Sequence, residues 1–263
     1  QAFSLLNGIF ALAIYDGRES GQKEGIKPGD LLLFRDGLGV KPLYYSETPS
    51  GFLFASELKA LLKSSEVSRE PNLESFIYLL TYLYSPAPHS PLKQVKKVEP
   101  GEWILVRDGR IQLKNYFYEV PYGKNRNSQS EKEIAEELRG ILEEAAKRQL
   151  ISDVPVGAFL SGGLDSSTVV ALMRKAEPSK PFQCFTIGSK GARAHQKDDL
   201  YYAKKVAAHF QLPLTVVDVA PRDFESLEKV IFHLDEPQAD PAALNALLIS
   251  EYTRPIRAMK SAM

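Results

Sequence analysis

The chain has 263 residues, with 33 basic and 33 acidic side chains, 44% hydrophobic and 25% charged residues. This is the composition of an ordinary folded soluble protein, and it excludes disordered, collagen-like and coiled-coil chains. The zero net charge gives no basic field that would hold a nucleic acid, and no apolar run approaches the roughly 18 residues of a membrane span. The single cysteine, Cys184, cannot form an internal disulfide. We therefore expect a cytoplasmic protein with neither nucleic-acid nor membrane partners.

The first region, residues 1–120, is rich in short strand patterns separated by turn residues. Runs of apolar and aromatic residues predict strands at 8–15, 30–35, 43–45 and 51–55. A helix is predicted over 72–83 behind an Asn72 N-cap, where Leu73, Phe76, Ile77, Leu80 and Leu83 recur at helical spacing. The turn Asp108-Gly109 predicts a closing hairpin between 103–107 and 112–118. This region is predicted to be an α+β domain with antiparallel strands.

Residues 121–130 are polar and contain Pro, Gly, Asn and Ser, so we place a linker there and a second domain at 131–263. Ser130 and Glu133 form a capping box before a helix over 131–149, whose apolar stripe contains Ile134, Leu138, Ile141, Leu142, Ala145 and Leu150. Strands at 156–160, 182–187 and 214–219 then alternate with helices at 167–175, 200–210 and 224–234. A helix-like pattern also continues through 257–263. The alternation predicts an α/β fold with a doubly wound parallel sheet and ligands at the carboxyl ends of its strands.

The sharpest motif is Ser161-Gly162-Gly163-Leu164-Asp165-Ser166-Ser167, directly after a predicted buried strand and before a helix. Two glycines let the backbone approach an anion, and the free N–H groups of the helix start together with the serine hydroxyls make a phosphate cradle. An acid in such a cradle makes sense if Asp165 binds a Mg²⁺ ion that neutralises the phosphates. The plainer alternative is a glycine-rich turn with a capping Ser or Asp. All seven residues in a strand-turn-helix context favour the cradle.

This motif resembles that of the PP-loop ATP pyrophosphatases, which cleave ATP between its α and β phosphates. The first region narrows the resemblance: 7–16 (NGIFALAIYD), 34–45 (FRDGLGVKPLYY) and 54–61 (FASELKAL) are similar to the later part of the glutaminase domain of glutamine-hydrolysing asparagine synthetases. Three further segments match that family in the same order, namely 99–101, 153–157 and 235–237. The resemblance covers nearly the whole chain.

The resemblance implies a partial N-terminal-nucleophile glutaminase domain over 1–120 and the first part of an ATP-binding synthetase domain over 131–263. The expected substrates are aspartate, glutamine and ATP, with Mg²⁺ as the metal. The expected reaction is adenylation of the aspartate side-chain carboxylate, followed by amidation with ammonia from glutamine. By the same resemblance, Ser161, Gly162, Gly163, Leu164, Asp165, Ser166 and Ser167 bind the phosphates or the metal, and Phe159, Ile187 and Gly188 lie at the adenosine. Plain core packing is the alternative role for these strand-end residues.

The chain departs from the family pattern at both ends. It has no N-terminal cysteine, which is the family's nucleophile, and the family's glutamine-binding stretch would lie upstream of Gln1. The family's second acidic loop would follow residue 263. We therefore expect a fragment that contains no catalytic residue and has neither glutaminase nor synthetase activity by itself. Cys184 lies in an apolar strand and is interpreted as structural.

Other charged residues have two interpretations each. Asp235, Glu236 and Asp240 either face the substrate side of the sheet or form a solvated helix end between prolines. Arg35, Asp36, Lys41 and Glu57 either lie toward an interface between the domains, as the resemblance suggests, or form a hairpin turn with solvated charges. Asp198 and Asp199 are predicted to cap a helix N-terminus. His89, His195, His209 and His233 have no metal-ligand spacing.

Two alternatives to asparagine synthesis stay open from the sequence. A relative with the same architecture could use another acceptor, as β-lactam synthetases and lasso-peptide cyclases do. A non-catalytic protein could keep the nucleotide cradle only as structure, although a packing role would not require Asp165. Because relatives are often dimers, a homodimer is also an open alternative.

Overall fold

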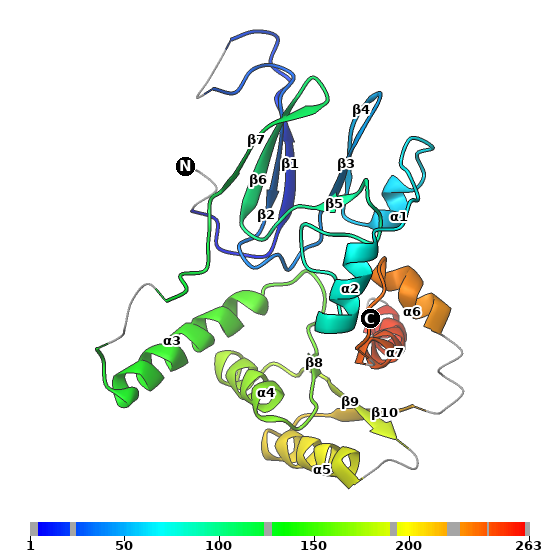
Figure 1. Ribbon diagram of the computed structural model, residues 1–263. Coiled ribbons are helices and arrows are strands. Elements are labelled where there is room, and N and C mark those ends of the chain that lie inside the picture. Colours follow the sequence, from blue (N-terminus) through cyan, green and yellow to red (C-terminus); the bar gives the residue numbers. More distant parts are fainter. Residues whose placement is uncertain are drawn as a thin grey trace. The chain divides into compact units, whose positions relative to one another are not determined.

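The computed structural model describes residues 5–21, 25–123, 128–189, 194–219, 227–240 and 242–260. The chain divides into two compact units, Gln1–Lys124 with Ile231–Asp240, and Asn125–Val230 with Pro241–Met263. The fold is mixed α/β, with antiparallel sheets in the first unit and a parallel sheet in the second (Figure 1). Among the helices of the described ranges, none combines the length and apolar character that crossing a membrane requires.

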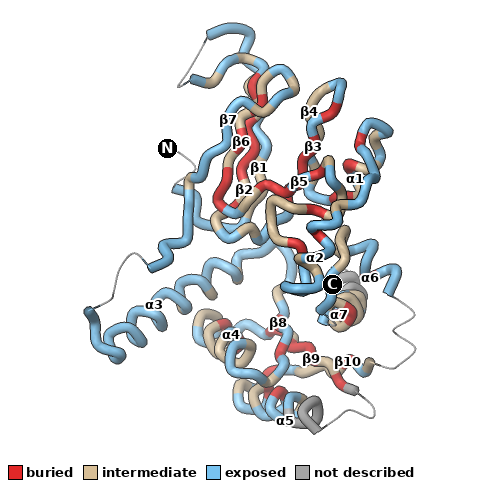
Figure 2. The backbone as a smooth tube through the Cα atoms, viewed as in Figure 1, coloured by how far each residue is buried: buried red, intermediate tan, exposed pale blue. Residues whose placement is uncertain are grey.

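The first unit contains two antiparallel sheets, and the predicted strands are all present. One sheet has the order β1-β2-β6-β7 and the other β4-β3-β5. Their bounds are β1 Ala11–Tyr15, β2 Leu31–Arg35, β3 Tyr44–Thr48, β4 Gly51–Ala55, β5 Lys96–Lys97, β6 Glu102–Arg107 and β7 Arg110–Tyr116. Leu33, Val98 and Ile104 are fully buried at the centre of one apolar cluster, which appears red in Figure 2. In β6 buried residues alternate with partly exposed ones, whereas β2 has three consecutive buried residues.

Two helices accompany these sheets, α1 Leu58–Leu61 and α2 Leu73–Tyr82. The predicted helix over 72–83 is confirmed, and Asn72 occupies the predicted N-cap position without acting as a side-chain cap. The Asn72 side chain makes no capping bond and instead donates from Nδ2 to the Ser90 carbonyl, 3.1 Å away. The apolar stripe of α2 is also exposed rather than buried, with Leu80 83% exposed.

The turn after β2 is built around the buried carboxylate of Asp36, so its interpretation as a solvated charge is wrong. Asp36 is 1% exposed and accepts hydrogen bonds from the N–H groups of Leu38 (3.2 Å), Val40 (2.9 Å) and Lys41 (3.0 Å). The Arg35 guanidinium donates to the carbonyls of Lys41, Val98 and Gly39 at 2.6–2.8 Å. The Asp36 carboxylate and the Arg35 guanidinium thus serve as hydrogen-bond partners for backbone N–H and carbonyl groups at this turn.

We expect Asp36→Asn to lower the free energy of unfolding by roughly 2 kcal/mol, because one accepting oxygen becomes a donor facing an N–H group. Burial raises the pKa of Asp36, but the backbone amides outweigh it and hold the pKa below its usual value. The carboxylate therefore stabilises the fold above about pH 4, and this contribution is lost as the pH falls through the folded-state value. Urea unfolding at pH 7 and pH 3 measures both effects. The exposed Asp108→Asn is the control, and an equal pH dependence in both variants would contradict the prediction.

The second unit contains a parallel sheet with the order β10-β9-β8. Its strands are β8 Ala158–Phe159, β9 Cys184–Ser189 and β10 Leu214–Val219, and its helices are α3 Glu131–Gln149, α4 Leu164–Ala176, α5 Ala194–His209 and α7 Ala242–Lys260. One buried cluster joins Cys184 to side chains of α4 and α5. Another joins Phe185 and Val217 to Ile249 of α7. Because successive residues of β9 point to opposite faces, helices cover both faces of the sheet.

Helix α3 has the predicted bounds and the predicted capping box. Glu133 Oε2 accepts from the Ser130 backbone N–H at 2.8 Å, and Ser130 Oγ accepts from the Glu133 N–H at 3.4 Å. Its apolar stripe is only partly covered, since no residue of α3 is buried and Ile141 is 59% exposed. Figure 2 shows this helix almost entirely in the colour of exposed residues.

Three predicted boundaries in this unit are wrong. The strand predicted over 156–160 is shorter, and its pairing with β9 runs only from Ala158 to Phe159. The helix predicted from 167 begins at Leu164, so the motif's Leu164, Asp165 and Ser166 form its first turn. The helix predicted from 200 begins at Ala194, so Asp198 and Asp199 lie within α5 and not at its first residue.

Helices α6 and α7 complete the chain. The last predicted helix appears as α6 Leu227–Leu234, and its predicted first residues, 224–226, lie outside the described residues. Helix α7 spans Ala242–Lys260, a much longer element than the pattern at the end of the sequence indicated.

Candidate nucleotide site

The seven-residue motif forms the connection between β8 and α4 in the second unit. Gly162 has φ +85°, a left-handed conformation that turns the chain directly into the helix. A Cβ atom at this position would lie 2.4 Å from the Asp199 carbonyl oxygen and 2.6 Å from the Ala203 nitrogen. The turn therefore packs directly against the backbone of α5, which only a glycine allows.

The serines brace this turn. Ser161 Oγ lies 3.0 Å from Ser166 Oγ and accepts from the Gly163 N–H at 3.4 Å, while Ser166 Oγ donates to the Gly163 carbonyl at 3.3 Å. The first helical bond runs from the Ser167 N–H to the Gly163 carbonyl, 3.1 Å. The N–H groups of the first helical turn, from Leu164 to Ser166, thus have no intrahelical acceptor and are available to an anion.

Gly163 is the N-cap of α4, and its environment is open. The nearest atom to a Cβ built there is Ser161 Oγ, 3.4 Å away. The Leu164 side chain is 82% exposed, so this residue can contribute only its backbone to an anion site. The backbone around Gly163 is therefore approachable from solvent.

Asp165 is exposed in the first turn of α4 and is not the cap of that helix. Among the described residues, its carboxylate has no hydrogen-bond or ion-pair partner, in contrast to the serines beside it. Carboxylate oxygens are ligands that Mg²⁺ prefers. A free carboxylate next to unpaired N–H donors fits a site for a metal-bound phosphate.

A cavity of about 410 Å³ lies beside this turn, at the carboxyl ends of β8 and β9. Its lining includes Phe159, Leu160, Ser161, Phe185, Thr186, Ile187, Asp199, Ala242, Asn245, Ala246 and Ile249. The volume and the mostly apolar walls are typical of small-molecule pockets. The structure thus brings together Phe159, Ile187 and the start of the motif.

Gly188 does not line this cavity. It is buried against β10, where a Cβ atom would lie 2.5 Å from Asp218 Oδ1 and 2.7 Å from Val216 Cγ1. Its visible role is therefore close packing between the two strands. The sequence reasoning missed Asp199 and the α7 residues in the lining. The pattern of apolar residues after residue 241 was the signal that could have revealed α7.

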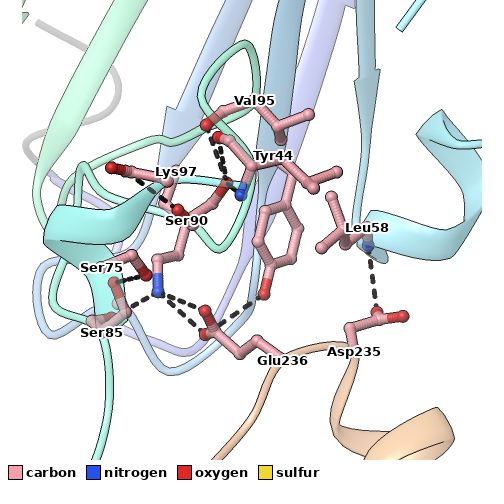
Figure 3. A network of polar contacts seen from close by, with 12 residues as sticks. Tyr44, Leu58, Ser75, Ser85, Ser90, Val95, Lys97, Asp235 and Glu236 are labelled. Carbon is pink, nitrogen blue, oxygen red and sulfur yellow. Dashed lines mark hydrogen bonds and ion pairs between the residues drawn. The ribbon is translucent and has the colours of Figure 1, made fainter. Parts of the chain in front are cut away.

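Asp235 and Glu236 belong to the first unit and are paired with lysines there, so their interpretation as a solvated helix end is wrong. Figure 3 shows their polar contacts. Asp235 accepts hydrogen bonds at the start of α1 and forms an ion pair with Lys59 Nζ at 2.9 Å. Glu236 forms an ion pair with Lys97 Nζ at 2.8 Å. Neither carboxylate lines the cavity described above. Asp240 is an exposed residue.

Cys184 is fully buried in β9. Burial raises the pKa of its thiol to about 11, so the reactive thiolate is scarce at neutral pH. This environment agrees with the structural role expected for it. Glu57, the other acid singled out in the first region, precedes α1 and is paired with Lys59 Nζ at 3.1 Å.

The chain matches two families of known proteins. The asparagine synthase family matches residues 137–259, and the glutamine amidotransferase domain matches residues 1–117. A provisionally named glutamine-hydrolysing asparagine synthetase 2 of Methanocaldococcus jannaschii is 34% identical over 94% of this chain and 46% of that protein. The glutamine-hydrolysing asparagine synthetase 1 of Bacillus subtilis is 31% identical over 95% of this chain and 37% of that protein. The glutamine-hydrolysing asparagine synthetase of Homo sapiens is 30% identical over 97% of this chain and 43% of that protein. The chain thus spans less than half the length of these relatives.

Proposed function

Because the chain belongs to the family of glutamine-hydrolysing asparagine synthetases, we propose that it is part of an enzyme that makes asparagine from aspartate, ATP and glutamine. The observation that carries the proposal is the 161–167 turn, whose free helix N-terminus lies beside an apolar cavity. A nucleotide needs both features, a donor-rich cradle for phosphates and an apolar slot for its base.

Each part of the site receives a role in this proposal. Residues 161–167 bind the β and γ phosphates, largely through backbone N–H groups and the serine hydroxyls. Phe159 and Ile187 line the adenosine slot, and Gly188 supports it by holding β9 against β10. Asp165 holds Mg²⁺, which when bound neutralises phosphate charge.

The proposed reaction has two steps. An oxygen of the aspartate side-chain carboxylate forms a bond to the α phosphorus of ATP, the bond between that phosphorus and the bridging oxygen breaks, and pyrophosphate leaves. Ammonia then attacks the carboxyl carbon, the bond to the AMP oxygen breaks, and one proton of ammonia is released. The turn contributes to the first step by stabilising the charge that builds up on the departing pyrophosphate.

We also propose that the two sequence regions divide the work. Residues 1–120 are part of an amidotransferase domain of the N-terminal-nucleophile type that supplies ammonia, and 131–263 are part of the synthetase domain with a doubly wound sheet. In this proposal the described chain contains no catalytic nucleophile, so neither activity is expected from these 263 residues alone.

The test is ATP-pyrophosphate exchange by the full-length protein with a panel of carboxylic acids. Exchange that requires aspartate, with asparagine and AMP formed once glutamine or ammonium is added, is the expected result. If exchange does not depend on aspartate but requires another carboxylic acid, that acid is the substrate that is adenylated. Absence of any exchange and of ATP binding would leave the turn as a structural feature and refute the proposal.

A further inference from the structure

Residues 231–240 lie between β10 and α7 in the sequence, yet they pack within the first unit. They are held there at several points along their length. Asp235 binds α1, Glu236 binds Lys97 of β5, and the Ala239 N–H donates to the Leu83 carbonyl at 2.9 Å. We call residues 231–240 the docking segment.

The strongest contact of the docking segment is a shielded ion pair. The Lys97 and Glu236 side chains are only 8% and 12% exposed, and Lys97 Nζ lies 2.8 and 2.9 Å from the two carboxylate oxygens. Lys97 Nζ also donates to the Ser85 carbonyl, and the Tyr44 hydroxyl donates to Glu236 at 3.4 Å (Figure 3). Because both charges are shielded from water, removing either one leaves the other uncompensated.

The buried position shapes the proton affinities of this cluster. Burial lowers the pKa of Lys97 below its usual value, although the neighbouring Glu236 opposes the shift. Burial and the same glutamate raise the pKa of Tyr44. The carboxylate thus stabilises the lysine in its charged form, and the pair gives the segment one fixed attachment.

Asp235 provides a second attachment. Its carboxylate accepts from the N–H groups of Leu58 (3.0 Å) and Lys59 (3.2 Å), at the start of α1. Glu57, the residue that precedes this helix, makes no side-chain capping bond, so Asp235 takes that role from a distant part of the sequence. Asp235 itself has φ +64°, an unfavourable conformation that persists because these contacts hold it.

The docking segment continues directly into the wall of the candidate nucleotide cavity. One residue separates Asp240, its last member, from Ala242, the first residue of α7. Ala242, Asn245 and Ala246 form the first turns of α7 and line the cavity, and Ile249 of the same helix packs on the sheet. Helix α7 therefore begins within two residues of the anchored segment, and within the second unit its Ile249 packs on the sheet.

We propose that Lys97 and Glu236 are positioning residues for the nucleotide, which act by anchoring the docking segment and with it the start of α7. The proposal rests on the proposed function, because it takes the cavity as the ATP site. Coupling is reciprocal, so an anchored segment favours ATP binding and bound ATP holds the segment and its partner loop, residues 83–97, more firmly. The synthetase site and the amidotransferase part of the sequence would communicate through this segment.

The first test measures the kinetics of ATP-pyrophosphate exchange in two variants of the full-length protein. Glu236→Gln keeps the shape of the side chain and removes its charge, and Lys97→Met removes the charge of the lysine. Each variant is expected to raise the KM for ATP at least about fivefold, with kcat within about twofold. The matched control is Lys114→Met, which removes another partly buried lysine of the first unit, 3.4 Å from Glu102, away from the docking segment. An unchanged KM in both variants, or an equal rise in the control, would overturn the proposal.

The second test does not depend on turnover. Amide hydrogen exchange is followed with and without Mg²⁺ and a non-hydrolysable ATP analogue. In the unaltered protein, we expect the analogue to slow amide hydrogen exchange at both 161–167 and 83–97. In Glu236→Gln, we expect it to slow exchange only at 161–167. Protection at 161–167 without protection at 83–97 would overturn the coupling while sparing the nucleotide site. Lack of protection at 161–167 would refute the nucleotide site and the coupling with it.

Discussion

Replacing Asp165 by asparagine is expected to slow aspartate-dependent ATP-pyrophosphate exchange by roughly 10²–10³-fold, while the protein stays folded. The carboxylate is exposed and without a partner among the described residues, so its loss removes no contact that supports the fold. If it binds the metal, its loss removes a charged ligand at the point where the departing pyrophosphate gains charge. The exchange assay in the presence of Mg²⁺ measures the effect, and thermal unfolding checks the fold.

The control for Asp165→Asn is Glu144→Gln, a change of the same kind on the exposed surface of the same unit. Glu144 forms a surface pair with Arg148 at 3.0 Å, and such pairs contribute little to stability. Both variants should therefore unfold within about a degree or two of the unaltered protein. Unchanged exchange in Asp165→Asn would remove the metal role from this residue, whatever else binds in the cavity.

Replacing the two glycines of the turn one at a time is expected to separate its structural role from its binding role. Gly162→Ala should destabilise the second unit by roughly 2–4 kcal/mol, because the new Cβ meets backbone atoms of α5 in a left-handed conformation. Gly163→Ala should leave the unfolding temperature nearly unchanged, since its Cβ meets only Ser161 Oγ at 3.4 Å. It should nevertheless weaken ATP binding roughly tenfold or more by obstructing the approach to the helix N-terminus.

Calorimetric unfolding and titration with the Mg²⁺ complex of ATP give the two readings for each glycine variant. The informative result is the contrast, with one variant unstable and the other stable but weak in binding. If Gly163→Ala bound ATP as tightly as the unaltered protein, the phosphates would not approach this backbone. If Gly162→Ala were as stable as the unaltered protein, the turn would not pack on α5 as closely as described.

Local patterns predicted most of the elements correctly. The strands of the first unit, the bounds of α3 and its capping box depend on alternation, periodicity and short-range side-chain contacts, which a single sequence displays directly. The strand-turn-helix setting of residues 161–167 was predictable for the same reason. It also placed Phe159 and Ile187 at the same edge of the sheet, because the carboxyl ends of parallel strands meet there.

The errors concern positions whose environment is defined only by the folded chain. Asp36 looks like a turn residue in solvent, and only the fold shows that it satisfies three backbone amides. Asp235 and Glu236 look like a solvated helix end, because their partners Lys59 and Lys97 lie more than a hundred residues away. The exposed apolar stripe of α2 likewise shows that periodicity predicts a helix but does not specify what covers its face.

The docking segment also determines how this polypeptide can be divided. The chain passes from one compact unit to the other three times, between residues 124 and 125, 230 and 231, and 240 and 241. A cut within residues 121–130 would therefore place Asp235 and Glu236 on a different fragment from the lysines that neutralise them. Recombination that exchanged only residues 1–120 for those of a relative would have to bring residues at 59 and 97 that match Asp235 and Glu236.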